Sequence, residues 1–403
     1  MDRGSNPFAP GAGNQPPELS GRGFVLAEAA VTLDRMRRRF HDRSQMLIGL
    51  RGVGKTVMLN RIDTMARERG FHSIILEAPE NKTIAEILIP EVRRLLLQLD
   101  LLAGAKDKAK RALGALRAFA SVFKVQIGDI GVGVTSPPGV ADSGDLARDL
   151  TDLLVLVGEA AAEKNTLVSI LIDEMQYLGE IDLGHLIAAF HRISQVNLPI
   201  VLFGAGLPQL AGLMGNAKSY TERLFAFKEI GALAREDAIK ALEEPVERAG
   251  VRFTAGALEE ILRATAGYPY FLQEWGKHAW IKAAKSPIGE DDAVAAGPEA
   301  IRELDQSFFR VRFDRLTPTE RDYVRAMAEL GPQPHRSGDI ALIMKRPVEQ
   351  VAPIRASVIK KGMVYAPAHG DTAFTVPMFD DYMKRAIPTF TPRPPRSRKN
   401  ATD

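Results

Sequence analysis

The sequence predicts an α/β fold: a five-stranded parallel sheet, then a helical lid domain and a winged helix-turn-helix domain. Five short apolar runs alternate with helical segments, at 44–50, 72–79, 166–174, 198–206 and 225–233. Such alternation is typical of a parallel sheet covered by helices on both faces. The strand pattern stops near residue 235, and three helices, the lid, follow. The last segment has the order helix, helix, helix and two short strands, which is the order of a winged helix.

Composition narrows the class of protein. The chain has 403 residues, of which 45% are apolar and 26% are charged, and its net charge is +3. This charge is too small to indicate a nucleic-acid binder by itself. The chain has no cysteine, which excludes disulfides and thiolate metal sites. No apolar run approaches the roughly 18 residues that span a bilayer, so we expect a cytoplasmic protein without a membrane partner.

The domain boundaries follow from changes in pattern along the chain. Gly, Pro and Ser in the first residues predict a disordered arm, and Pro and Arg in the last ones predict a disordered tail. Alternation of Phe123, Val125 and Ile127 predicts a β-hairpin. The predicted units are an arm over 1–22, a core over 23–233 with the hairpin at about 122–135, a lid domain and linker over 234–298, a winged helix domain over 299–388 and a basic tail over 389–403.

The strongest motif is GLRGVGKT, which follows the first apolar run and precedes a helix. Its glycines adopt backbone angles closed to other residues and let main-chain N–H groups approach an anion. A lysine after them can reach the outer phosphates of a nucleotide, and a hydroxyl can ligate Mg²⁺. The sequence therefore predicts a triphosphate site formed by Gly49, Gly52, Val53, Gly54, Lys55 and Thr56.

Two carboxylates end the third apolar run, LVSILIDE. Asp173 is expected to hold Mg²⁺ with Thr56, because the metal needs a carboxylate at the carboxyl edge of the sheet. Glu174 is expected to orient or deprotonate the attacking water. An acidic strand so late in the chain favours ATP over GTP, and the Asn-Lys-x-Asp run of GTPases is absent.

Several segments together resemble one family of ATPases. GLRGVGKT, ILIDEMQYL, VLFGAGLP, YTERLFAFKEIGALAREDAIKAL and ATAGYPYFLQEWG resemble the AAA+ branch that contains archaeal-type and origin-recognition-like ATPases, near the STAND group. The resemblance implies an ATP- and Mg²⁺-dependent switch that often forms homo-oligomers. It matches Arg223 to an arginine that acts in trans on a neighbour's γ-phosphate, and Pro269 to a lid segment near the adenine.

Two departures from this family affect the expected rate of hydrolysis. The strand that carries a polar sensor in relatives ends here in Gly204-Ala205-Gly206. The lid segment GYPYF also lacks the arginine that some relatives use as a second sensor. Slow hydrolysis, or hydrolysis only after assembly, is consistent with both departures.

The partner of the C-terminal domain stays open between DNA and protein. The expected recognition helix, PVEQVAPIRASVIKKG, carries Arg355, Lys360 and Lys361, and Lys345 and Arg346 precede it. Residues 316–388 nevertheless hold ten Lys and Arg against eight Asp and Glu, a small excess for a protein that neutralises several phosphates. Three hypotheses follow: an ATPase that engages DNA, a signalling switch that contacts protein, and a nucleotide-binding scaffold with negligible turnover.

Overall fold

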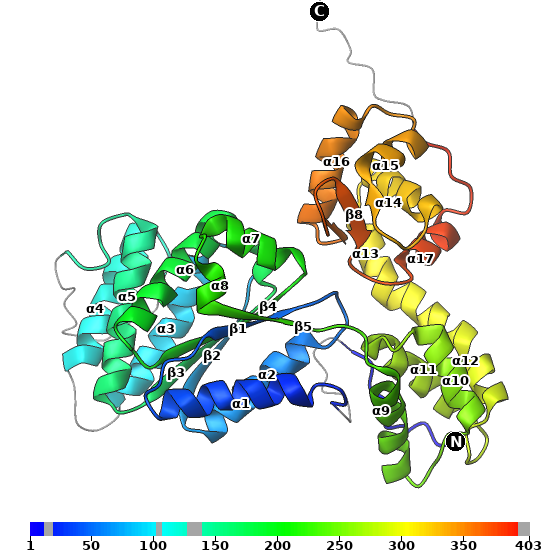
Figure 1. The fold of residues 1–403 in the computed structure, drawn as a ribbon, viewed down its shortest axis with the longest axis horizontal. Coiled ribbons are helices and arrows are strands. Elements are labelled where there is room, and N and C mark those ends of the chain that lie inside the picture. Colours follow the sequence, from blue (N-terminus) through cyan, green and yellow to red (C-terminus); the bar gives the residue numbers. More distant parts are fainter. Residues whose placement is uncertain (12–18, 102–106, 127–138, 394–403) are drawn as a thin grey trace, which may run out of the picture.

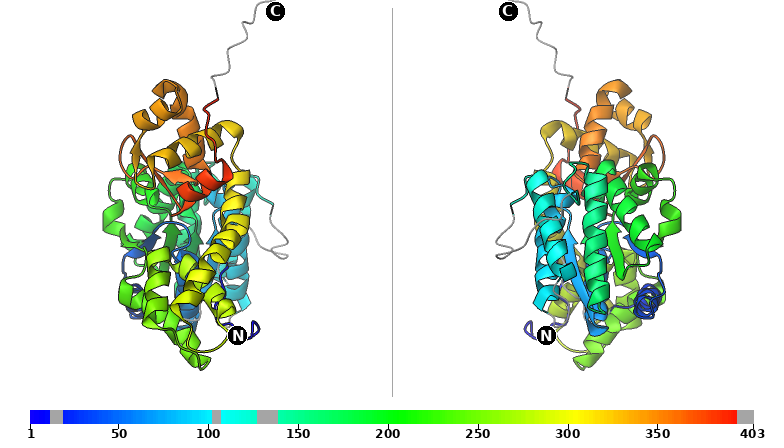
Figure 2. Two further views of the ribbon diagram at one scale, coloured as in Figure 1. Left: turned by 90° about the vertical axis from the view of Figure 1, so that its right-hand side faces the viewer. Right: turned by 90° about the vertical axis from the view of Figure 1, so that its left-hand side faces the viewer.

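The computed structural model describes residues 1–11, 19–101, 107–126 and 139–393. It consists of an α/β core, a helical lid domain and a C-terminal domain (Figure 1). The lid and the C-terminal domain lie on the same side of the core, and the side views in Figure 2 show the C-terminal domain above the lid. None of the helices in the described ranges is both long enough and apolar enough to cross a bilayer.

The core contains the predicted five-stranded sheet, and all of its strand pairs are parallel. The strand order is β2-β3-β4-β1-β5. The strands are β1 (Ser44–Ile48), β2 (Phe71–Glu77), β3 (Leu167–Asp173), β4 (Ile200–Gly206) and β5 (Phe225–Glu229). Strands β1, β3 and β4 are buried along their whole length, which explains their continuous apolar sequences. The carboxyl ends of β1 and β3 therefore meet at one edge, with β4 between them.

Helices cover both faces of this sheet. Side chains of α1 and α2 pack with Leu47 and Leu171 on one face, whereas those of α3 and α5 pack with Met46 and Ile170 on the other, as the two-residue period of a strand requires. The core helices are α1 (Gly23–Arg37), α2 (Lys55–Glu68), α3 (Ile84–Leu101), α4 (Asp107–Val122), α5 (Leu146–Glu163), α6 (Glu180–Gln195), α7 (Gln209–Ala217) and α8 (Thr221–Leu224).

The hairpin predicted over 122–135 is wrong at its beginning. Val122 is the last residue of α4, and residues 123–126 form a turn and coil. Phe123 continues the apolar face of that helix, because its ring lies 4.7 Å from the ring of Phe119 one turn earlier. The remainder of the predicted hairpin, residues 127–135, lies outside the described residues.

The lid domain has four helices rather than three helices and a linker. They are α9 (Arg235–Arg248), α10 (Ala255–Thr265), α11 (Pro269–Lys282) and α12 (Glu290–Glu303). Ala293, Ala296 and Ala300 are fully buried on one face of α12, so the segment expected to be a linker forms a packed helix. A π-helix (Leu304–Phe309) and α13 (Arg310–Asp314) continue it without interruption. The predicted boundary at residue 299 therefore falls inside a helix.

The prediction of a disordered arm is also wrong for residues 1–11, which pack on the lid. The indole Nε1 of Trp280 donates to the carbonyl oxygen of Asp2 at 2.7 Å, and Asn6 Nδ2 donates to Lys277 O at 3.0 Å. Phe8 is 5% exposed and lies over Gly276, where a Cβ would stand 2.7 Å from its ring. Residues 1–11 are thus packed on the lid, and Phe8 belongs to the hydrophobic core.

The C-terminal domain combines helices with a small antiparallel sheet of order β6-β8-β7. Its elements are α14 (Pro318–Leu330), β6 (His335–Arg336), α15 (Ser337–Ile343), α16 (Val348–Lys360), β7 (Val364–Tyr365), β8 (Asp371–Phe374) and α17 (Phe379–Ala386). This order, a helix, a strand, two helices and a pair of strands, is compatible with a winged helix. The winged helix itself stays a prediction.

Candidate functional site

The glycine-rich loop lies where the sequence predicts it, between β1 and the first turn of α2. Gly52 and Gly54 have φ angles of +84° and +94°, a region that favours glycine. A Cβ on Gly49 would stand 2.0 Å from the carbonyl oxygen of Ile230. Helix α2 begins at Lys55, so its free N–H groups and the positive end of its dipole face the loop. These are the features of an anion-binding turn.

Lys55 is a buried cation whose only hydrogen-bond partners in the described structure are backbone carbonyls. Its side-chain Nζ donates to Gly49 O at 2.9 Å and to Leu50 O at 2.8 Å, and the residue is 7% exposed. Burial lowers the pKa of Lys55 to about 8, although the carboxylates of Asp173 and Glu174 oppose this change. An anion in the loop would compensate the buried charge.

Thr56 and Asp173 meet across the sheet edge, as the sequence predicts. The hydroxyl of Thr56 donates to Asp173 Oδ2 at 2.5 Å. Asp173 is 7% exposed, and burial raises its pKa while the bond from Thr56 opposes the rise. A hydroxyl and a carboxylate side by side are hard oxygen donors of the kind that Mg²⁺ prefers, so this pair fits the predicted metal.

Glu174 occupies an unusual backbone conformation at the end of β3, with φ 54° and ψ 34°. Such left-handed angles are uncommon outside glycine and cluster at functional sites. Its Oε1 lies 3.6 Å from Arg51 Nη1, and the side-chain amide of Gln176 donates to its other oxygen. Gln176 Oε1 in turn accepts from the backbone N–H of Leu207 at 3.0 Å. Glu174 is thus held between the glycine-rich loop and the end of β4.

Close packing at the end of β4 explains why this strand carries glycine at positions 204 and 206. A Cβ on Gly204 would lie 2.3 Å from the sulfur of Met175 and 2.4 Å from that of Met46. A Cβ on Gly206 would lie 2.7 Å from Leu210 and 2.9 Å from Gln176. A polar sensor side chain does not fit here without displacing these neighbours.

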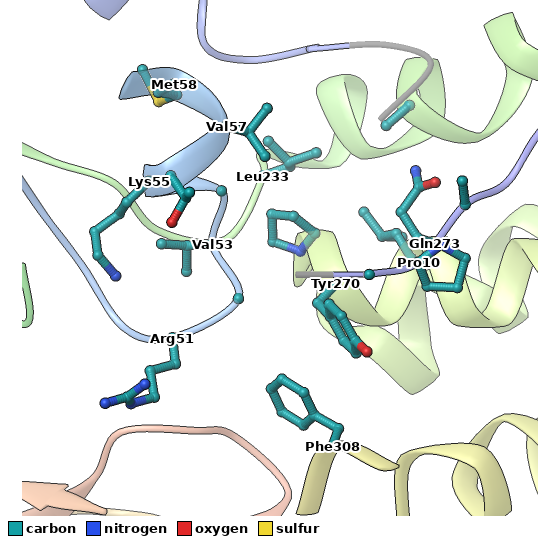
Figure 3. A pocket seen from close by; sticks show the side chains of 18 of the residues that line it. Pro10, Arg51, Val53, Lys55, Val57, Met58, Leu233, Tyr270, Gln273 and Phe308 are labelled. Atoms are coloured by element: carbon teal, nitrogen blue, oxygen red, sulfur yellow. The ribbon is translucent and has the colours of Figure 1, made fainter. Parts of the chain in front are cut away.

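A cavity of about 450 Å³ lies against the loop, between core, lid, arm and π-helix (Figure 3). Pro269 lines it, as do Gly52, Val53, Gly54, Lys55, Thr56 and Glu174. Lys55 and Arg51 stand at one end of the view, and Pro10 and Gln273 at the other. Its size suits a small organic ligand. The sequence interpretation missed Pro10, Gln273, Phe308 and Arg312, which no motif marks because they come from distant segments.

Aromatic rings and an arginine form a stack beside the loop. The rings of Tyr270 and Phe308 are stacked with centroids 4.5 Å apart, and the guanidinium of Arg312 lies 4.0 Å over Phe308. The backbone N–H of Tyr270 donates to Gly52 O at 3.3 Å. Burial, together with the charge of Arg51, lowers the pKa of Arg312 to about 10. The cavity thus contains a second poorly compensated cation besides Lys55.

Arg51 joins the glycine-rich loop to the C-terminal domain. Its backbone N–H donates to Thr375 O at 3.1 Å, and its side-chain Nε donates to Gly362 O at 3.3 Å. Arg51 Nη2 also donates to the Tyr177 hydroxyl at 2.5 Å, beside its ion pair with Glu174. One residue of the loop therefore contacts both the candidate catalytic acid and the C-terminal domain.

Arg223 does not belong to this cavity. It is an exposed residue of α8, just before β5, and lines a separate hollow with His41 and Arg43. Because β1 and β5 are parallel, the amino end of β5 lies at the sheet edge opposite the glycine-rich loop. A role for Arg223 in hydrolysis would therefore require the site of a second copy.

The cations expected on the recognition helix are mostly engaged within the C-terminal domain. Arg355 donates to Thr372 Oγ1 and to Asp371 O, both at 2.7 Å. Lys361 donates to Glu320 Oε2 at 2.6 Å and to Arg315 O at 2.9 Å. Lys360 is exposed.

Comparisons with known proteins agree with this geometry. Residues 18–203 match the family model described as AAA ATPase domain, and residues 306–383 match a domain of unknown function, DUF8462. No curated protein gives a significant match.

Among solved structures, the chain is similar to the Walker-type ATPase PABY2304 of Pyrococcus abyssi, with 16% identity and a TM-score of 0.53 over 89% of this chain and 95% of that one. Weaker likenesses include the Aeropyrum pernix ORC1 protein in complex with DNA (16% identity, TM-score 0.46, 92% and 94% covered). Another is RuvB of Thermotoga maritima, with 12% identity and a TM-score of 0.45 over 93% of this chain and 97% of that one. At 16% identity the likeness to the Pyrococcus protein concerns the fold alone.

Proposed function

We propose that this chain, an AAA+ P-loop ATPase, is a molecular switch in which ATP at the glycine-rich loop controls the position of the C-terminal domain. The single observation that carries the proposal is the set of contacts made by Arg51. The residue belongs to the loop expected to hold phosphate, pairs with the candidate catalytic acid, and donates to the C-terminal domain at Gly362 and Thr375.

ATP binding is assigned to the loop and the residues around it. The N–H groups that follow Gly52 and Gly54 would face the phosphates, and Lys55 would exchange its two backbone carbonyl partners for phosphate oxygens. Thr56 and Asp173 would hold Mg²⁺, which supplies charge neutralisation at the phosphates when bound. Pro269 would lie beside the base. Support comes from the burial of Lys55 and Asp173 and from their position around one cavity.

Hydrolysis is assigned to Glu174, which would orient water and accept its proton. In the described state its carboxylate is held by Arg51 and Gln176, so it is not free to serve a water molecule. Arg223 would act only in trans, where a cation stabilises the charge of the transferring phosphoryl group. Basal turnover would therefore be slow and would rise on assembly of several copies.

The surface of the C-terminal domain is more consistent with a protein partner than with DNA. Arg355 and Lys361 are used within the domain, which reduces the charge available for phosphates. The exposed residues nearby include apolar ones, since Leu342 is 77% and Val348 44% exposed. A gel shift at two salt concentrations tests this choice: affinity for duplex DNA that collapses as salt rises would favour the DNA-binding alternative.

The switch is tested with a wedge between the two domains. Gly362 has a φ of +64°, and a Cβ there would stand 2.7 Å from Arg51 Nη2 and 2.9 Å from the Tyr177 hydroxyl. Gly362→Ala should displace the Arg51 guanidinium, which weakens the contact between the domains and raises basal ATP turnover several-fold by releasing Glu174. Gly370→Ala is the matched control, because Gly370 also has a positive φ, +85°, but its Cβ would meet no atom within 4 Å.

Separation of the domains is measured independently of turnover. The chain has no cysteine, so the double variant Thr64→Cys, Glu349→Cys can carry a pair of spin labels on the core and the C-terminal domain. Both positions are exposed. If Gly362→Ala lengthens the label distance but turnover stays at the level of Gly370→Ala, the proposed coupling is wrong. If the unsubstituted chain and Glu174→Gln both hydrolyse ATP at the same negligible rate, the hypothesis of a nucleotide-binding scaffold replaces the proposed switch.

A further inference from the structure

The edge of the sheet opposite the glycine-rich loop carries a cluster of exposed arginines. The cluster is formed by the last turn of α1, the connection from α1 to β1, and α8. Helix α8 ends where β5 begins, and β1 and β5 are parallel, so these segments meet at the amino ends of both strands. In Figure 1 this edge lies on the side of the core away from the lid. The exposed arginines are Arg35, Arg37, Arg38, Arg39, Arg43 and Arg223.

Carboxylates neutralise only part of this charge. Arg35 and Arg37 each form an ion pair with an aspartate. Arg39 donates instead to a neutral group, the side-chain oxygen of Asn165, at 2.7 Å. An arginine without a carboxylate beside it keeps its charge available to an anionic partner. In the part of the chain that the structure describes, ion pairs are not formed by Arg38, Arg39, Arg43 or Arg223.

A hollow of about 260 Å³ opens beside the cluster, between the α1–β1 connection, α6 and α8. Its lining holds two arginines, Arg43 and Arg223, with one histidine, two serines and one carboxylate. That carboxylate belongs to Asp42, which already pairs with Arg35. The volume is below the roughly 300–1,000 Å³ of sites that enclose a whole small molecule. The hollow therefore suits one anionic group of a larger partner, and a phosphate matches the planar guanidinium groups.

Phe40 stands within the cluster and is 60% exposed. One exposed apolar side chain is ordinary on a protein surface, but here arginines precede and follow it. Aromatic rings on which bases stack, set among cations that follow the phosphates, are typical of sites for single-stranded nucleic acid. A polybasic membrane site uses lysine as well as arginine, whereas residues 35–43 contain five arginines and no lysine. The composition thus favours a nucleic acid over an anionic membrane.

We propose that this arginine cluster and Phe40 bind single-stranded nucleic acid, with a base stacked on the ring and a phosphate in the hollow beside Arg43 and Arg223. The inference goes beyond the proposed function, because the surface lies at the opposite edge of the sheet from the glycine-rich loop and needs no ATP. Every base has a flat face, so binding is largely independent of sequence. The bases of a duplex are stacked on one another, so a duplex binds through its phosphates alone and more weakly. A bound strand and a second copy of the chain would compete for Arg223.

Fluorescence anisotropy in the absence of ATP tests the stacking contact. The probes are a labelled oligothymidine of about 20 nucleotides, longer than the site of a single module, and a duplex of the same length. The unsubstituted chain should bind the single strand about tenfold more tightly than the duplex. Phe40→Ala should weaken binding of the single strand about tenfold, through loss of one stacked base, and so remove the preference. Phe24→Ala is the matched control, because Phe24 is 74% exposed at the other end of α1, and it should leave both affinities unchanged.

The salt dependence of the affinity tests the arginines separately. Each phosphate contact on a single strand contributes about 0.7 to the slope of log affinity against log salt concentration. The double variant Arg38→Gln, Arg43→Gln should therefore reduce the steepness of this slope by about 1.4, whereas Phe40→Ala should leave it unchanged. The double variant Arg252→Gln, Arg263→Gln, which removes two exposed arginines from the lid, is the control for charge and should keep the slope of the unsubstituted chain.

Three results would overturn the inference. The first is equal affinity for single strand and duplex that Phe40→Ala does not change, since charge alone would then explain binding. The second is binding to vesicles that contain phosphatidylserine without binding to the oligothymidine, which would assign the surface to a membrane. The third is a lower molar mass of the Arg38→Gln, Arg43→Gln variant in light scattering with unchanged oligothymidine binding, which would assign the surface to a second copy. The substituted side chains are exposed, so unchanged unfolding midpoints should accompany the loss of binding.

Discussion

Binding of Mg²⁺-ATP should take up protons at alkaline pH, because Lys55 is partly neutral before the nucleotide binds. Burial lowers the pKa of this ammonium to about 8. A polyphosphate within its reach favours the charged form and raises the pKa again. At pH 8 about half of the Lys55 side chains carry a proton before binding, and almost all carry one afterwards. Linkage then predicts an uptake of about 0.5 proton per ATP at pH 8 and about 0.9 at pH 9.

The same linkage fixes the sign of the pH dependence. Because the bound state holds more protons, ATP affinity falls as the pH rises through 8, by about tenfold per pH unit once Lys55 is mostly neutral. The pKa of Arg312 is lowered only to about 10, so its titration interferes little between pH 8 and 9. Titration of Lys55 therefore dominates the pH dependence of ATP affinity between pH 8 and 9.

Calorimetry in two buffers with different ionisation enthalpies measures the proton uptake directly. Lys55→Arg is the matched control, because a guanidinium stays charged at pH 9. That variant should bind ATP, if weakly, without buffer-dependent heat. Equal affinity of the unsubstituted chain at pH 7.5 and pH 9.5, with no difference between buffers, would refute the assignment of Lys55 to the phosphates.

Three further predictions concern the acids, the metal and the arm. Glu174→Gln should keep ATP affinity but lower turnover at least about 100-fold, as loss of a general base does, and rapid hydrolysis by this variant in a phosphate-release assay would exclude the base. Thr56→Val should leave metal-free nucleotide binding intact but abolish its enhancement by Mg²⁺, measured by titration with and without chelator; an enhancement equal to that of the unsubstituted chain would remove the ligand role. Gly276→Ala should expel Phe8 and cost about 1–3 kcal/mol of stability through overpacking, so residues 1–11 should become sensitive to limited proteolysis, and resistance equal to that of the unsubstituted chain would contradict the packing described.

The sheet and the loop could be predicted because their signals are local. A strand buried on both faces needs a continuous apolar run, and β3 and β4 consist of such runs. Likewise, the loop requires glycine at Gly52 and Gly54 for its own backbone, whatever the rest of the chain does. Asp173 and Thr56 could be paired in advance, because parallel strands bring their carboxyl ends to one edge.

Contacts between distant segments could not be predicted in this way. Composition marked residues 1–22 as a disordered arm, yet the packing of residues 1–11 depends on Gly276 and Trp280 far along the chain. Residues 286–298 read as a linker because Gly and Pro disfavour a helix and because their small Ala side chains mark no strongly apolar face. The helix in this segment is stabilised by packing of small residues against α10 and α11, which outweighs propensity. Arg51 occupies a position that the loop motif leaves open, so its role depends on the C-terminal domain.

The charges around the cavity explain why a nucleotide would move a domain. Four cations, Arg22, Arg51, Lys55 and Arg312, line the cavity, whereas Asp173 and Glu174 supply two acids beside it. The lowered pKa values of Lys55 and Arg312 show that burial of this charge is incompletely compensated. A polyphosphate would attract Arg51 as well as Lys55, in competition with Glu174 and with the carbonyl of Gly362. We infer that binding and domain contact draw on the same guanidinium, so each weakens the other by an equal free energy.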